Sequence, residues 1–149
     1  GVPLIDPGFF RPLQLLLQQG RIRPSPESIW TYFTRAPTTM HNSKWHLLQA
    51  TLDLYWAVID AAHAALMKLD VVPPSPEHVA DMLEEMMVKP GIISKKHTQT
   101  MRNFYKLSKM IIHRDIKGVS GQEYDRYYKD AYDFVNTMKM FLEGRIKKK

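Results

Sequence analysis

Four basic side chains fall on one line of a helix predicted over residues 95–113: Arg102, Lys106, Lys109 and His113. Their spacings of four, three and four residues place them in one narrow stripe, because an α-helix advances about 100° per residue. Four basic groups in line repel one another, so a bound anion would stabilise them, and RNA or nucleotide phosphates are the obvious anions. The same pattern is typical of a solvated basic helix face, and the sequence leaves both interpretations open.

A second set of polar residues follows the long helix predicted over residues 43–69. Gln49, Asp53 and Asp60 lie along one flank of its apolar face, and His63 lies near the middle of that face. Asp60 precedes His63 by three residues, a spacing at which its carboxylate could orient the ring for proton transfer. Two structural interpretations compete: His63 as a hydrogen-bonded core residue, and the aspartates as partners of the basic stripe across the bundle.

Motifs of the common enzyme classes are missing from the sequence. It has no glycine-rich phosphate loop, no HExxH and no GxSxG, and it lacks the Gly-Ser with paired acids of nucleotidyltransferase active sites. His41, His46, His78 and His97 do not have the spacing of metal ligands. The chain has no cysteine, which excludes disulfides and thiolate sites and fits a cytoplasmic location. We therefore expect neither a metal site nor a cofactor in this domain.

Length and charge narrow the class of protein further. The 149 residues fit one domain that buries roughly two-thirds of its unfolded surface. The net charge of +6 favours phosphate-bearing or acidic partners, although Lys147, Lys148 and Lys149 supply three of these charges as a solvated basic tail. No apolar run approaches the roughly 18 residues that a membrane span needs, so we expect no membrane partner.

The elements that must position these residues are predicted to be helices joined by short loops. We expect helices over residues 25–35, 43–69, 76–88, 95–113 and 122–143. Ser25-Pro26 and Ser75-Pro76 are typical helix starts, because Ser can cap a free N–H group and Pro fits the first turn. Pro37 is expected to separate the first two helices. The pattern predicts an all-α, antiparallel helical bundle of four to five main helices, with a short helical lead-in at its N-terminus.

Three of these helices carry apolar stripes that predict the core. In the long helix the stripe comprises Trp45, Leu48, Leu52, Tyr55, Trp56, Ile59 and Leu66. In the helix over residues 95–113 it comprises Met101, Phe104, Tyr105, Ser108, Ile111 and Ile112. In the last helix it comprises Tyr124, Tyr127, Tyr128, Ala131, Phe134, Val135, Met138, Phe141 and Leu142.

The helical region resembles a HEPN domain, over roughly residues 44–142. The resemblance is carried by residues 55–67 (YWAVIDAAHAALM), 73–79 (PPSPEHV), 105–113 (YKLSKMIIH), 121–125 (GQEYD) and 131–135 (AYDFV). The stretches LIDPGFF and GRI before the bundle resemble the segment that joins a nucleotidyltransferase domain to such a helical domain in archaeal-type proteins. The chain opens on Gly, and we expect a fragment made of a lead-in (residues 1–24), a HEPN-like bundle (25–146) and a basic tail (147–149).

The resemblance implies a helical domain that dimerises. Ribonuclease members of the family carry Arg and, after four to six residues, His; these meet at the dimer cleft and cut RNA without metal. Other members bind substrate or regulate an attached nucleotidyltransferase. Here Lys106 stands where Arg is expected before His113, and Lys cannot grip phosphate bidentately as Arg does.

Three functions therefore remain open. The first is a non-catalytic module of a two-domain nucleotidyltransferase that binds nucleotide or RNA phosphate. Its expected site comprises Arg102, Lys106, Lys109 and His113 as phosphate contacts, with Asp60 and His63 orienting them. The second is a metal-independent ribonuclease, with His113 as general acid and base and Lys106 stabilising the phosphorane charge. The third is a dimerisation or interaction bundle without a ligand site.

Overall fold

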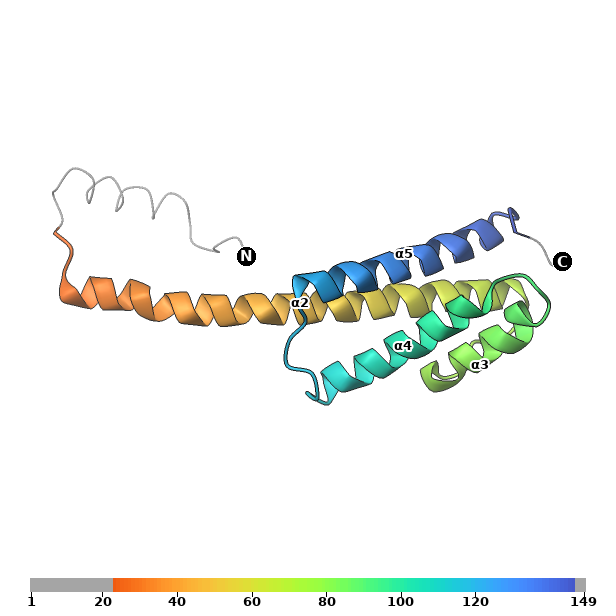
Figure 1. Ribbon diagram of the computed structural model, residues 1–149, viewed down its shortest axis with the longest axis horizontal. Helices are drawn as coiled ribbons and strands as arrows, with labels where there is room; N and C mark the ends of the chain where they lie inside the picture. Colours follow the sequence, from red (N-terminus) through yellow and green to blue (C-terminus); the bar gives the residue numbers. More distant parts are fainter. Residues whose placement is uncertain (1–22, 147–149) are drawn as a thin grey trace. The chain divides into compact units, whose positions relative to one another are not determined.

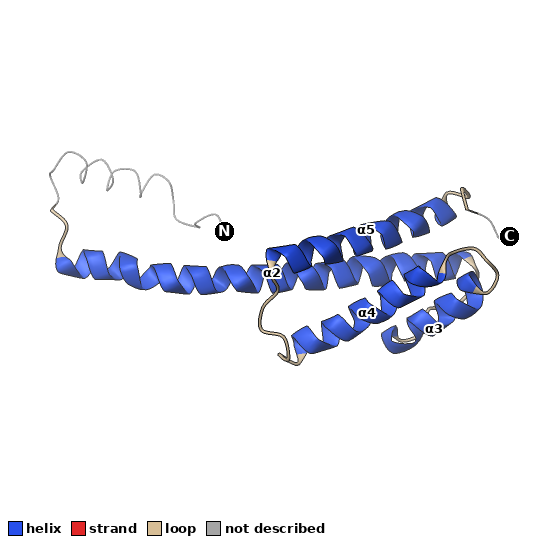
Figure 2. Ribbon diagram, viewed as in Figure 1, coloured by secondary structure: helices blue, strands red, loops and turns tan. Residues whose placement is uncertain are grey.

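The computed structural model describes residues 23–146, whose regular structure is entirely helical (Figures 1 and 2). The helices are α2 (Pro26–Lys68), α3 (Val79–Leu83), α4 (Lys95–Ile112) and α5 (Gly121–Leu142), with a 3-10 turn at Pro76–His78 and a π-helical turn at Glu84–Val88 on either side of α3. The predicted all-α helical bundle is confirmed. The predicted helical lead-in, apart from residues 23 and 24, and the basic tail lie outside the described residues.

α2 is a single helix of 43 residues, so the predicted break at Pro37 is wrong. A proline inside a helix removes one backbone hydrogen bond and costs about 3 kcal/mol, but this is a local cost and the helix continues on both sides. The predicted cap at its start is confirmed, because the Ser28 N–H donates to the Ser25 hydroxyl oxygen at 3.1 Å. Among residues 23–146, those up to residue 42 and those from residue 43 onward belong to two different compact units, and the bundle belongs to the second. In the first unit, the α2 side chains of residues 26–42 are all exposed.

Within the bundle, the second half of α2, α3 and α5 run in one direction, and α4 runs in the opposite direction (Figure 1). α4 runs opposite to α3 and α5, and pairs from α4 to α5 such as Lys96–Asp133 and Phe104–Tyr127 follow this order (Figure 1). The second half of α2 and α5 run in the same direction, because their carboxyl ends meet where the Lys68 Nζ donates to the Leu142 carbonyl oxygen at 2.7 Å. Residues 71–75, which have no regular secondary structure, bring the chain back along the bundle, because Ser75 and Pro76 line a hollow with Tyr55 and Trp56 of α2.

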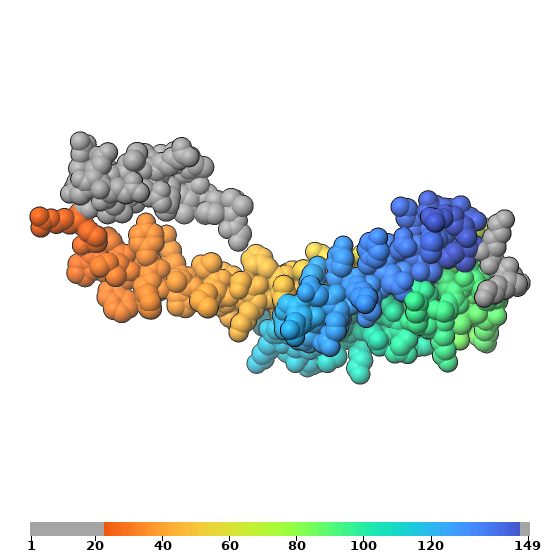
Figure 3. All heavy atoms as spheres, turned by 45° about the horizontal axis from the view of Figure 1, so that its top comes forward, coloured from red at the N-terminus to blue at the C-terminus, as the bar shows by residue number. Residues whose placement is uncertain are grey.

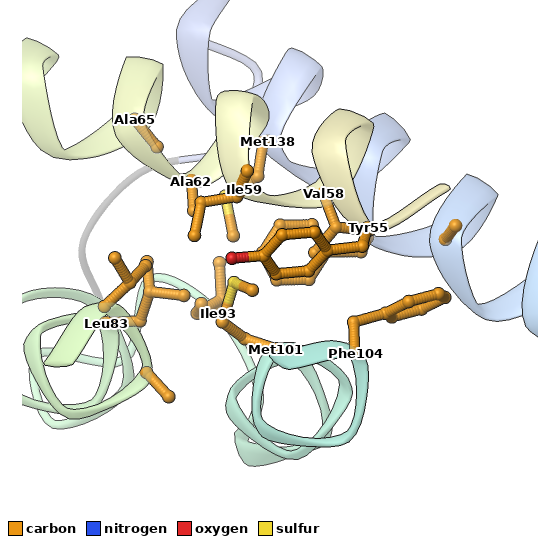
Figure 4. Packing of buried hydrophobic residues seen from close by; sticks show 14 of the residues in the cluster. Tyr55, Val58, Ile59, Ala62, Ala65, Leu83, Ile93, Met101, Phe104 and Met138 are labelled. Carbon is orange, nitrogen blue, oxygen red and sulfur yellow. The ribbon is translucent and has the colours of Figure 1, made fainter. Parts of the chain in front are cut away.

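The core lies where α2, α3, α4 and α5 converge, and Figure 4 shows part of it. α2 contributes Ile59, Ala62 and Ala65, whose small or branched side chains permit close packing. Around them lie Leu83 of α3, Met101 and Phe104 of α4, and Met138 of α5 (Figure 4), and Phe134 of α5 belongs to the same buried cluster. The predicted stripes are confirmed at their centres and wrong at their edges. The edge residues Trp45, Trp56, Ile112, Tyr128 and Leu142 are exposed, because a helix buries only the arc that its neighbours cover.

The start of α5 is fixed by a reciprocal cap. The Ser120 hydroxyl oxygen accepts from the Glu123 N–H at 3.0 Å, and the Glu123 carboxylate accepts from the Ser120 N–H at 3.1 Å. These bonds from the Ser120 backbone and side chain hold the pKa of Glu123 below its usual value. Because Ala cannot accept the N–H bond, Ser120→Ala should lower the free energy of unfolding by about 1 kcal/mol, measured by urea denaturation.

Ser94 provides the matched control, because it precedes α4 with a similar extended backbone but makes no side-chain cap bond. Ser94→Ala should therefore change the free energy of unfolding by less than about 0.5 kcal/mol. Equal losses in the two variants would contradict the assigned cap.

Candidate functional site

α4 is a strongly basic helix, with Lys95, Lys96, Arg102, Lys106 and Lys109 and no acidic residue. Two of these cations are neutralised by other helices. The Arg102 Nη2 lies 2.9 Å from the Asp81 Oδ1 of α3, and the Lys96 Nζ lies 3.1 Å from the Asp133 Oδ2 of α5. Within residues 23–146, the other three lysines form no ion pair. α4 therefore keeps a cationic outer face that is only partly compensated.

The four residues of the predicted stripe share one side of α4 but do not line one common groove. Lys106 lines a hollow of about 330 Å³ between α4 and α5, together with Tyr127 and Asp130. Lys109 lines a different hollow of about 300 Å³, formed with α2 and the 3-10 turn that precedes α3. Figure 3 shows the side chains of α5 in blue and those of the α3–α4 region in green as one continuous surface.

The two ends of the stripe differ in their surroundings. Arg102 is held by Asp81 and lines a third, polar hollow of about 300 Å³ with Glu84 and Thr98. His113 is exposed at the carboxyl end of α4, where its N–H donates to the Lys109 carbonyl oxygen at 2.9 Å. Lys106 and Lys109 are thus the members of the stripe that combine a free ammonium group with an adjacent hollow.

Asp60 and His63 do not form the predicted pair. Asp60 is exposed, and no hydrogen bond joins its carboxylate to the His63 ring in the part of the chain that the structure describes. The His63 Nε2 is enclosed by the protein and has no hydrogen-bond partner among those residues. No ion pair within residues 23–146 joins Asp60 or His63 to the basic stripe.

His97 is the buried histidine of the bundle, on the side of α4 that faces α5. Its ring packs edge-on against the Phe134 ring, with 5.9 Å between ring centres. Burial lowers the pKa of His97, and Lys96 lowers it further, while Asp133 opposes both. Burial therefore disfavours the protonated form of this core ring.

The hollow beside Lys109 contains exposed aromatic and apolar surface that the sequence had assigned to the core. Trp56 is 54% exposed and Ile112 is 57% exposed, and both line it. The Lys109 Nζ lies 5.4 Å from the centre of the Tyr105 ring, in a cation–π contact. A pattern of apolar residues places Trp56 at the edge of the stripe, but only the neighbouring helices show that this edge is uncovered.

The described residues contain no cluster of three His, Cys, Asp or Glu side chains arranged to hold a metal ion. Across positions 23–146, every helix is too short or too polar to cross a membrane. Comparison of the chain with family models, curated proteins and solved structures found no match.

Proposed function

We propose that this bundle is a non-catalytic phosphate-binding module. In this proposal it is the substrate-binding or regulatory HEPN domain of an archaeal-type, two-domain nucleotidyltransferase in the cytoplasm. Its ligand is RNA or a nucleotide, bound by the outer face of α4. An upstream nucleotidyltransferase domain and a second copy of the chain are its proposed protein partners. The HEPN assignment and these partners rest on the sequence resemblance alone.

One observation supports phosphate binding: α4 has five cations and no acid, and three of the cations have no ion pair within residues 23–146. Lysines three or four positions apart on a helix are neighbours, with about 5–6 Å between their Cβ atoms, and their charges repel. Phosphates placed along this face would remove that repulsion and release their counterions. A bound polyanion is therefore favoured over the empty surface.

The geometry favours RNA over a single nucleotide. Lys106 and Lys109 line two different hollows, one toward α5 and the other toward α2 and the 3-10 turn before α3. One phosphate cannot occupy both hollows, whereas successive phosphates of a strand crossing the outer face of α4 can meet both ammonium groups. A strand that contacts both lysines at once gains affinity through multivalent binding, and a mononucleotide does not.

The test is a titration of the protein with a fluorescently labelled single-stranded oligoribonucleotide, followed by anisotropy at several salt concentrations. The logarithm of the association constant should fall linearly with the logarithm of salt, with a slope of about −0.7 per neutralised phosphate. ATP in the same buffers should bind more weakly than the oligomer.

Absence of RNA binding at low salt, or binding that does not weaken as salt rises, would contradict the proposal. Cleavage of the RNA that disappears in His113→Ala would instead favour the ribonuclease alternative. Gel analysis of the same mixtures measures this directly.

A further inference from the structure

The hollow beside Lys109 has three walls of different chemistry. α2 contributes the rings of Tyr55 and Trp56, whose centres lie 5.1 Å apart. α4 contributes Tyr105 and Lys109, and the turn that begins α3 contributes Glu77. The hollow thus has aromatic surface, a cation on one side and a carboxylate on another.

Its size and exposure fit a flat ring. A volume of about 300 Å³ is at the lower end of the range of small-ligand sites. Trp56 is 54% exposed, so its indole presents apolar surface beside the hollow. A planar ligand stacked on the indole would remove this apolar surface from water, and aromatic rings are the usual platforms for unpaired bases.

The charges at the hollow match a nucleotide in the same orientation. The Lys109 ammonium contacts the Tyr105 ring and has no carboxylate partner among residues 23–146, so it is available for a phosphate. The Glu77 carboxylate lies 3.3 Å from the His78 Nε2 and can accept hydrogen bonds, but it repels phosphate. A nucleotide would therefore place its phosphate toward α4 and its base toward α2 and the start of α3.

We infer that this hollow is a subsite for one unpaired nucleobase, which stacks on Trp56 while its phosphate contacts Lys109. The inference rests on the proposed RNA-binding function and makes it more specific, since a base that is paired and stacked inside a duplex cannot enter. The ligand class is single-stranded RNA. Stacking of the base adds to the binding free energy, and this contribution does not depend on the salt concentration.

The experiment compares Trp56→Ala with Trp45→Ala by anisotropy. Trp45 is a similarly exposed tryptophan on the same helix and does not line the hollow. Loss of base–aromatic stacking should weaken single-strand binding about tenfold in Trp56→Ala, with an unchanged salt slope. Trp56→Phe should keep most of the affinity because it retains a ring. Trp45→Ala should bind as the wild type does.

Two further ligands separate the base from the phosphates: an abasic strand of the same length and an RNA duplex. Trp56→Ala should leave the binding of both unchanged. Thermal melts by circular dichroism confirm that the variants fold.

The outcomes separate the two proposals. Wild-type binding that weakens with salt but is equal in Trp56→Ala overturns the base subsite and leaves the phosphate-binding function standing. A wild type that binds neither the oligomer nor the abasic strand overturns both. An equal loss for the abasic strand in Trp56→Ala would also overturn the subsite, because that ligand has no base to stack.

Discussion

Phe134→Ala is expected to lower the free energy of unfolding of the bundle by about 3–5 kcal/mol. The Phe134 side chain is 0% exposed, and its ring packs against the buried His97 ring of α4. Truncation removes the apolar contacts and leaves a cavity that surrounding helices fill only in part. Because domains are stable by only about 5–15 kcal/mol, this loss is a large share of the total. Urea denaturation followed by circular dichroism measures it.

Tyr132→Ala is the control for this experiment. Tyr132 lies two residues earlier on α5 and is 63% exposed, so its replacement should change the free energy of unfolding by less than about 0.5 kcal/mol. A loss below about 1 kcal/mol for Phe134→Ala would show that α5 does not pack on α4 as described.

Reversal of two charges on α4 should have the largest effect on RNA binding. In the double variant Lys106→Glu/Lys109→Glu, both free ammonium groups beside the hollows become carboxylates that repel phosphate. Loss of two charge-assisted contacts should raise the dissociation constant for the oligoribonucleotide at least about a hundredfold. The salt dependence should also become shallower, by about 0.7 in slope for each lost contact.

The double variant Lys129→Glu/Lys139→Glu changes the net charge by the same amount on exposed positions of α5. It should retain the wild-type dissociation constant to within about threefold if local contacts on α4, and not the overall charge, determine binding. Equal losses in the two double variants would mean that RNA is attracted by the net charge alone.

The helices of the bundle could be predicted from the sequence because their buried apolar residues recur every three to four positions. The bounds predicted for the helix over residues 95–113 differ from those of α4 by one residue. The continuity of α2 through Pro37 could not be predicted, since proline more often ends a helix than continues it. The π-helical turn at Glu84–Val88 also has no signal in the apolar pattern, which fits an ordinary α-helix equally well.

The candidate site was only partly predictable for a related reason. Spacing correctly places Arg102, Lys106 and Lys109 on one side of α4, but it does not show that Asp81 of α3 neutralises Arg102. That ion pair depends on how α3 packs against α4, and the residue spacing within one helix carries no information about this packing. Trp56 was predicted to be in the core for the same reason. Its place in the apolar stripe can be read from the sequence, but whether another helix covers it cannot.

The meeting of α2 and α5 at their carboxyl ends has an electrostatic consequence. Each helix places about half a negative charge at that end, so two like poles lie side by side. Lys68 offsets both: it stands in the last turn of α2, and its ammonium bonds the Leu142 carbonyl oxygen and lies 5.8 Å from the centre of the Phe141 ring. One side chain therefore serves as a terminal counterion of two helices, and neutralising its charge would weaken the compensation of both poles at once.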